Sequence, residues 1–192
     1  MGFRGARPGG GTASGLVLYA SKYGSTRACA EAIADALGVA ALDVAVSEQA
    51  ELALAGAAWA VLGSPIYGPS VLPAMERFCG RAREALAARE LAAFVVCGDT
   101  VWLPRAGEGG ERNLAKLTRL LPRAPFATAV LGGRMVVEEL DEQDRALILA
   151  FYRRLGRSPD GFDRTDPTEL ADFADRVRTA LDEGPVPPDH AT

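Results

Sequence analysis

Histidine is nearly missing from this 192-residue sequence. The single one, His190, lies in a Pro-rich polar tail at the C-terminal end. Its position excludes a Ser-His-Asp triad, a Cys-His pair and a histidine-based metal site in the folded part. We therefore predict no metal and no catalytic side chain. If the protein is an enzyme, a bound cofactor must carry the chemistry.

Cysteine and long apolar runs are also scarce. Cys29, Cys79 and Cys97 form no CxxC motif, and their odd number argues against a disulfide framework. The longest apolar stretch, about 53–63, is too short to span a bilayer, and no signal-peptide core follows the N-terminus. We expect a cytoplasmic protein.

Lysine occurs only at Lys22 and Lys116, and the net charge of −4 is mild. No excess of positive charge favours nucleic acid, so we predict no nucleic-acid partner.

Apolar runs alternate with helical patterns along most of the chain. Strands are predicted at 15–20, 41–46, 57–63, 91–97 and 126–132. Helices are predicted at 25–37, 48–54, 71–89, 111–121, 138–155 and 167–182. This alternation predicts an α/β fold: a doubly wound, five-stranded parallel sheet in the order 2-1-3-4-5, with helices on both faces.

One domain, residues 15–182, accounts for all of these elements. Gly-rich and Pro-rich composition predicts a disordered leader (1–14) and a disordered tail (183–192). Residues 133–166, between the fifth strand and the last helix, are more than a connection requires.

The stretch "SKYGST" (21–26) joins the first predicted strand to the first predicted helix. Unpaired backbone N–H groups and the positive helix dipole make such a loop an anion site, to which Ser and Thr add donors. The pattern is neither G-x-G-x-x-G nor a P-loop, so a monophosphate fits better than a dinucleotide or a nucleoside triphosphate. The alternative is that these residues only cap the helix.

Two further loops, "GSPIYGPS" (63–70) and "CGDTVWLP" (97–104), leave strands at the same edge of the sheet. Each carries an aromatic residue, Tyr67 or Trp102. A phosphate cradle beside two aromatic loops indicates a flat, phosphorylated heterocycle.

At these residues the sequence resembles flavodoxin-type FMN-binding domains, which use T-x-T-G-x-T at the phosphate. Ser21, Tyr23, Gly24 and Thr26 occupy those positions, with Tyr23 in place of the second Thr. The stretches "YASKYGSTRACAEAIA", "VLGSPIYGPSVLPAMERF" and "LGGRM…DGFDRTDPTELADFADRV" are similar to the subgroup that includes menaquinone-dependent protoporphyrinogen oxidase. The resemblance covers about residues 15–182.

That resemblance implies FMN as the cofactor and assigns it three sets of residues. The phosphate would be held by Ser21, Lys22, Tyr23, Gly24, Ser25 and Thr26. One wall of the isoalloxazine site would be Ser64, Pro65, Ile66, Tyr67 and Gly68, and the other Gly98, Asp99, Thr100 and Trp102. A peptide ending at Gly68 could flip at low cost to meet the reduced flavin, whereas Asp99 could equally be a turn residue.

Residues 100–135 carry six Lys or Arg against two Glu. Arg105, Arg112 and Lys116 therefore suggest a basic rim for a carboxylated substrate or an anionic membrane surface. The alternative is an ordinary solvated helix face.

The predicted helix 138–155 places Leu147, Ile148, Phe151 and Leu155 on one face. We expect that face to pack on the sheet. The alternatives are a lid over the flavin and an interfacial anchor, which the acidic start of the segment disfavours.

The resemblance implies an FMN-dependent oxidoreductase like protoporphyrinogen oxidase, which passes electrons from a reduced organic substrate through FMN to a quinone. Its partners would be that substrate, the quinone and, peripherally, the inner membrane face. An electron-transfer flavodoxin and an NAD(P)H-quinone reductase are the alternatives, and the basic residues near the flavin disfavour an electron carrier.

Overall fold

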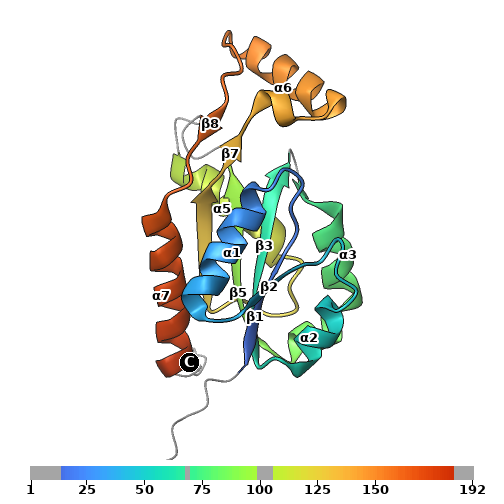
Figure 1. Ribbon diagram of the computed structural model, residues 1–192, viewed down its shortest axis with the longest axis vertical. Coiled ribbons are helices and arrows are strands. Elements are labelled where there is room, and N and C mark those ends of the chain that lie inside the picture. The colour runs from blue at the N-terminus through green and yellow to red at the C-terminus, as the bar shows by residue number, and fades with distance from the viewer. Residues whose placement is uncertain (1–13, 68–69, 99–105, 184–192) are drawn as a thin grey trace, which may run out of the picture.

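A central parallel sheet organises the protein. The computed structural model describes residues 14–67, 70–98 and 106–183 (Figure 1). The parallel strands are β1 (Gly15–Tyr19), β2 (Ala40–Asp43), β3 (Trp59–Tyr67), β5 (Glu90–Cys97) and β6 (Ala127–Gly132). Their order is β2-β1-β3-β5-β6, and β4 (Ser70–Val71) pairs antiparallel with β3. These five strands are the five predicted ones, so the predicted 2-1-3-4-5 order is confirmed.

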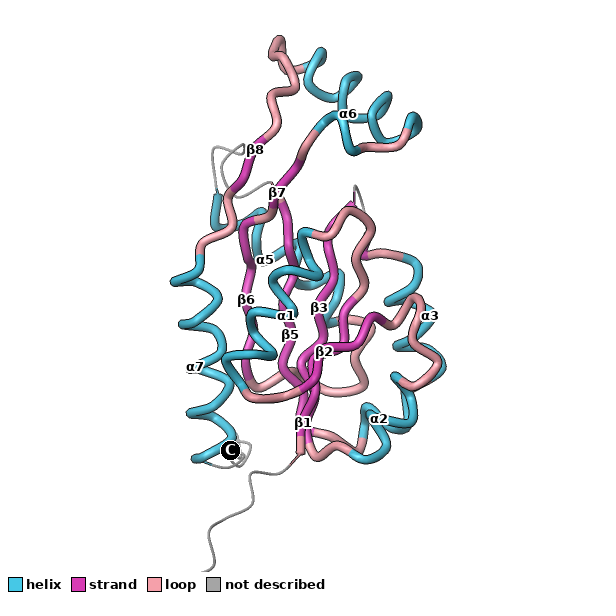
Figure 2. Tube along the Cα trace, viewed as in Figure 1, coloured by secondary structure: helices cyan, strands magenta, loops and turns pink. Residues whose placement is uncertain are grey.

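Helices cover both faces of this sheet (Figures 1 and 2). One face carries α1 (Ser25–Leu37) and α7 (Pro167–Glu183); the other carries α2 (Ala50–Gly56), α3 (Pro73–Arg81), α4 (Arg83–Ala87) and α5 (Ala106–Thr118). Ile33 and Phe173 are fully buried on the first face, and Phe78 and Leu86 on the second. Because both faces are covered, β5 reads as a nearly continuous apolar run.

Local signals set most of the boundaries. Gly24 and Gly38 flank α1, both at positive φ, and the helix occupies the predicted residues 25–37. The predicted strand 41–46 ends early at Asp43, whose carboxylate accepts a hydrogen bond from Ala45 N in a turn. The predicted helix 71–89 is two helices, α3 and α4, which meet at Ala82.

Residues 133–166 form a separate layer, which we call the roof segment. It contains β7 (Arg134–Met135), the short 3-10 helix η2 (Val137–Glu139), α6 (Glu142–Arg154) and β8 (Phe162–Asp163). Strands β7 and β8 pair antiparallel, and α6 lies beyond the carboxyl ends of the parallel strands, at the top of Figure 1. The prediction that this helix packs on the sheet was wrong.

The connections to the sheet explain that position. At Gly132, where β6 ends, a Cβ atom would lie 2.1 Å from the backbone oxygen of Arg164, so the outgoing and returning chains meet there. We call this close approach of Gly132 and Arg164 the neck. From the neck the chain continues into β7, and α6 follows beyond the edge of the sheet. Tyr152 is the only buried residue that α6 contributes. No described helix has both the length and the apolar character to cross a membrane.

Candidate functional site

The loop between β1 and α1 opens at the carboxyl edge of the sheet. Gly24 is the residue before α1 and has φ of 84°, a left-handed conformation that glycine adopts without steric cost. The capping position is a glycine and supplies no side-chain cap, although Ser21 Oγ accepts a hydrogen bond from Arg27 N in the first turn at 3.3 Å. The first turn of α1 therefore retains backbone donors for an anion.

Thr26 is the most informative residue of this loop. Its side chain is 1% exposed, yet it lies in the wall of a cavity. Among the buried side-chain polar atoms of the described residues, Thr26 Oγ1 alone has no hydrogen-bond partner. A buried hydroxyl without a partner costs free energy, so this atom is suited to a ligand that accepts or donates a hydrogen bond there.

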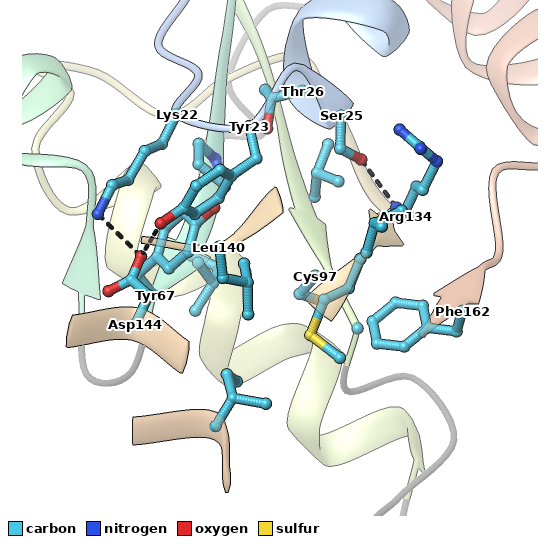
Figure 3. Close-up of a pocket in the computed structure, with 18 of the residues that line it drawn as sticks. Lys22, Tyr23, Ser25, Thr26, Tyr67, Cys97, Arg134, Leu140, Asp144 and Phe162 are labelled. Atoms are coloured by element: carbon cyan, nitrogen blue, oxygen red, sulfur yellow. Dashed lines mark hydrogen bonds and ion pairs between the residues drawn. The ribbon is translucent and has the colours of Figure 1, made fainter. Parts of the chain in front are cut away.

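Lys22 and Tyr23, from the same loop, turn toward the roof segment (Figure 3). Lys22 Nζ lies 2.7 Å from Asp141 Oδ2 and 2.8 Å from Asp144 Oδ2. The Tyr23 hydroxyl donates to Asp144 Oδ2 at 2.7 Å and accepts from Asp141 N at 3.2 Å. We call these four residues the latch. They explain why tyrosine replaces the second threonine of the resembled motif: its longer side chain reaches the roof.

The latch shifts the pKa values of Lys22 and Asp141. Hydrogen bonds to Asp141 and then Asp144 raise the pKa of Lys22. The backbone N–H of Asp144 and the ammonium of Lys22 lower the pKa of Asp141 to about 2. Both groups are therefore charged across the neutral pH range, and the ion pair persists there.

Ser25 links the same loop to the start of the roof segment. Its Oγ accepts a hydrogen bond from Arg134 N at 2.9 Å, and the side chain lies in the cavity wall (Figure 3). The Arg134 guanidinium is 3.0 Å from Glu139 Oε1. Lys22 and Tyr23 of the β1–α1 loop and Ser25, the first residue of α1, thus hold the roof segment on one side of the cavity.

A second wall comes from the end of β3. Pro65, Ile66 and Tyr67 line the cavity. The Tyr67 ring lies 6.1 Å from the Tyr23 ring at 58°, and burial raises the pKa of its hydroxyl. Ser64 is fully buried outside the cavity wall: its Oγ donates to Pro65 O and accepts from Leu72 N, which joins β3 to the start of α3.

The third predicted wall is represented by Gly98, at the end of β5, which also lines the cavity. A Cβ atom at Gly98 would lie 2.4 Å from Phe162 Cζ, so glycine allows the roof strand β8 to approach β5. The other predicted residues of these two loops, Gly68, Asp99, Thr100 and Trp102, and the rim residue Arg105 lie outside the described residues.

These walls enclose a cavity of about 470 Å³, a size typical of small-molecule sites. Its floor is the β1–α1 loop and the ends of β3 and β5, and its far side is the roof segment, from which Leu147, Ile148 and Phe151 of α6 face inward. Ser21, Lys22, Tyr23, Ser25 and Thr26 lie in one wall, so the structure brings together most of the residues predicted for the phosphate. Gly24 shapes the turn without lining the cavity.

Sequence reasoning missed several lining residues. They are Arg134, Met135, Leu140, Asp144 and Phe162 of the roof segment and Asn113 of α5. Asn113 is 6% exposed, and its Oδ1 accepts from Lys116 Nζ at 2.8 Å. The unusual length of 133–166 was the available signal for the roof residues, whereas nothing local marks Asn113.

The proposed basic rim is only partly described. Arg112 and Lys116 both belong to α5, and neither lines the cavity. Lys116 is connected to the cavity through its hydrogen bond to Asn113, which lines the cavity. Their role toward a substrate stays a prediction.

Comparisons with known proteins agree with this geometry. A family model described as flavodoxin domain matches residues 16–160. A comparison with curated proteins found no match.

Several solved structures share the fold. A flavodoxin, WrbA-like protein from Agrobacterium tumefaciens is 17% identical, with a TM-score of 0.50 over 87% of this chain and 98% of that chain. A flavodoxin from Streptococcus pneumonia TIGR4 is 15% identical, with a TM-score of 0.51 over 87% of this chain and 99% of that chain. Rubredoxin oxygen:oxidoreductase from Desulfovibrio gigas is 14% identical, with a TM-score of 0.53, and its match covers 88% of this chain but 36% of that one. At such identities the likeness shows the fold alone.

Proposed function

Since this chain belongs to the flavodoxin domain family, we propose that it binds FMN in the cavity and acts as an FMN-dependent oxidoreductase. It takes electrons from a reduced organic substrate and passes them to a quinone. When bound, FMN supplies the redox chemistry that this chain's side chains lack. The sequence resemblance suggests protoporphyrinogen as the first donor to test.

The residues of the β1–α1 loop fit an FMN phosphate. Thr26 Oγ1 is a buried hydroxyl without a protein partner, and Ser21 and Ser25 lie in the same wall. The N-terminus of α1, whose capping position is a glycine, adds backbone donors and a favourable dipole for a dianion. In this proposal Lys22 stays bonded to the latch carboxylates and positions the loop, while the hydroxyls and backbone donors hold the phosphate.

The ring of the cofactor would lie between the other walls. Ile66 and Tyr67 are half-buried at the end of β3, and Gly98 directly follows the neighbouring strand β5. These residues would exclude water and orient the ring. The cofactor carries the electron transfer. No side chain of the described cavity is therefore given a proton-transfer role.

One observation favours an enzyme over an electron carrier: the roof segment forms the far side of the cavity. Leu147, Ile148 and Phe151 of α6 line the same cavity as Ser25 and Thr26 of the phosphate loop. A carrier exchanges electrons with a protein docked at an exposed flavin edge, and such a roof would stand between them. A small organic substrate could enter beneath it.

Anaerobic rapid mixing of the FMN-loaded protein tests this function. Bleaching of the flavin absorbance is followed with protoporphyrinogen, with NADPH and with a reduced redox protein, and recolouring is followed on addition of menadione. We expect fast bleaching by the organic donor and fast recolouring by the quinone. Bleaching by the redox protein alone would assign an electron carrier, and bleaching by NADPH alone would assign a quinone reductase.

A further inference from the structure

Asn113 is a buried polar residue whose presence the packing of the sheet layers does not explain. It is the only asparagine of the chain, and it lies in the interior of α5, where asparagine is a poor helix former. Its side chain is buried and lines the cavity. Because buried polar groups in proteins are hydrogen-bonded, the partners of this amide indicate its role.

One end of the amide is fixed by Lys116. The Lys116 ammonium donates a hydrogen bond to Asn113 Oδ1 at 2.8 Å, one helical turn away. An ammonium cannot accept a hydrogen bond, so the amide oxygen must face Lys116 and the Nδ2 group must lie on the other side of the amide. The same bond polarises the amide and makes its N–H groups stronger donors.

The Nδ2 group of Asn113 is left for a ligand. Within the described residues, no hydrogen bond of Nδ2 is found. Thr26 Oγ1 is the only fully enclosed side-chain polar atom without a partner in that part of the chain, so Nδ2 keeps contact with the open space of the cavity. The cavity therefore presents an oriented N–H donor, which suits an acceptor atom such as a carbonyl oxygen.

Asn113 and Thr26 reach the cavity from opposite faces of the sheet. Leu117 of α5 belongs to the core on one face, and Cys29 of α1 belongs to the core on the other. A ligand with its phosphate at Thr26 that extends across the edge of the sheet brings its other end to Asn113. In FMN that other end is the isoalloxazine ring, whose pyrimidine part carries two carbonyl oxygens.

We infer that Asn113 binds the flavin ring: its Nδ2 group donates a hydrogen bond to one of the two pyrimidine carbonyl oxygens of FMN. Lys116 is then a positioning residue that orients the amide, in agreement with its place outside the cavity wall. The inference rests on the proposed function for the identity of the cofactor. If Asn113 had only a structural role, it would bind Lys116 and make no difference to a ligand altered at the ring.

Small changes in the ligand and in the side chain test this bond. The ligands are FMN, riboflavin, 2-thio-FMN and 4-thio-FMN, and in each thio analogue sulfur, a weak acceptor, replaces one carbonyl oxygen. Asn113→Asp keeps an acceptor for Lys116 but removes the donor, and Asn113→Leu has a similar size without any polar group. Thr26→Val is the matched control at the phosphate end. Titration calorimetry gives the affinities, and thermal melting shows that each protein is folded.

We expect wild-type protein to bind one of the two thio analogues about fivefold more weakly than FMN, which identifies the bonded carbonyl. Both Asn113 variants should bind FMN and riboflavin about tenfold more weakly, with the same factor for each, because the phosphate is not involved. They should also bind FMN and that thio analogue equally. Thr26→Val should instead weaken FMN more than riboflavin and keep the wild-type preference for FMN over the analogue.

The outcomes separate this inference from the proposed function. Equal binding of FMN and both thio analogues by wild-type protein would overturn the inference while FMN binding stands. Asn113 variants that keep the preference for FMN, or that weaken FMN but not riboflavin, would overturn it in the same way. The comparison of ligands on wild-type protein needs no variant, so it decides the matter even if a variant does not fold. If FMN binds but no donor bleaches it, the proposed function fails and these affinities still decide the role of Asn113. If no flavin binds, both fail.

Discussion

The sheet with its two helical layers and the roof segment are built by different means. In the sheet layers, Phe94 and Phe173 are fully buried with their rings 6.0 Å apart. In the roof segment, Leu140 and Tyr152 are the buried hydrophobic residues, while Leu147 and Phe151 are exposed. The sheet layers are thus stabilised by apolar burial, whereas the roof depends on polar contacts with the loops beneath it.

Because of this difference, the residues that stabilise the fold are not the ones that line the roof side of the cavity. Polar contacts at half-exposed positions contribute little free energy, so the roof belongs to the less stable part of the molecule. We therefore expect that loss of these contacts would leave the core intact. Four experiments test this contrast, from the largest expected effect to the smallest.

Phenylalanine-to-alanine substitutions in the sheet layers and in the roof segment compare how much each region contributes to the free energy of unfolding. Phe94→Ala should lower the free energy of unfolding by about 3–5 kcal/mol, because it opens a cavity in a closed core. Phe151→Ala, on the exposed face of α6, should change it by less than about 0.5 kcal/mol. Urea denaturation followed by circular dichroism gives both values. Similar losses would mean that Phe151 is packed as tightly as the core residue and would contradict the exposure of this face of α6.

Thr26→Val tests whether Thr26 Oγ1 contacts the phosphate of FMN, as proposed. Because Thr26 Oγ1 has no partner among the described residues, valine removes no bond within the protein, and stability should not fall. FMN affinity should fall by about 1.5–3 kcal/mol, the range for a hydrogen bond to a charged group, while riboflavin affinity changes little. Fluorescence quenching titrations compare the two flavins. Equal weakening of both would place the phosphate elsewhere.

Gly132→Ala tests the neck of the roof. The new Cβ would lie 2.1 Å from a backbone oxygen of Arg164, which cannot move aside as a side-chain end can. We expect a loss of about 1–3 kcal/mol from this overpacking. Gly80→Ala is the control: it lies on an exposed part of α3 with no atom within 4 Å and should stabilise the protein by about 0.5–1 kcal/mol. If both variants were more stable than the wild-type protein, the backbone at Gly132 and Arg164 would have to be able to move apart.

Asp141→Asn tests the latch and should have the smallest effect. Asparagine can still cap α6 but loses the ion pair with Lys22. Because folding lowers the pKa of Asp141 from 3.8 to about 2, its charge stabilises the fold above pH 3.8, and this contribution is lost as the pH falls toward 2. Melting temperatures of the two proteins should differ slightly near neutral pH and converge over that acidic range. A difference that persists below pH 2 would exclude the ion pair as its cause.

Local patterns were enough for the elements of the sheet layers. The glycines around α1 and the apolar run of β5 are signals within a few residues, and both elements were predicted within one residue of their observed bounds. The short strands β4, β7 and β8, of two residues each, carry no such pattern. Helix α6 was predicted as a helix, but its apolar face could not show whether it packs on the sheet or faces a cavity.

The sequence by itself determined the order of the parallel strands and the place of the β1–α1 loop at the carboxyl edge of the sheet, because hydrophobic periodicity and the handedness of βαβ connections act locally. Only the tertiary structure decided what Lys22 and Tyr23 bind. Tyr23 and Asp144 are 121 residues apart, and no local pattern pairs them. Two other features also depend on the tertiary structure. Phe162 approaches Gly98, and Leu147 and Phe151 are exposed toward the cavity. They follow from the neck at Gly132, which carries the roof past the end of the sheet.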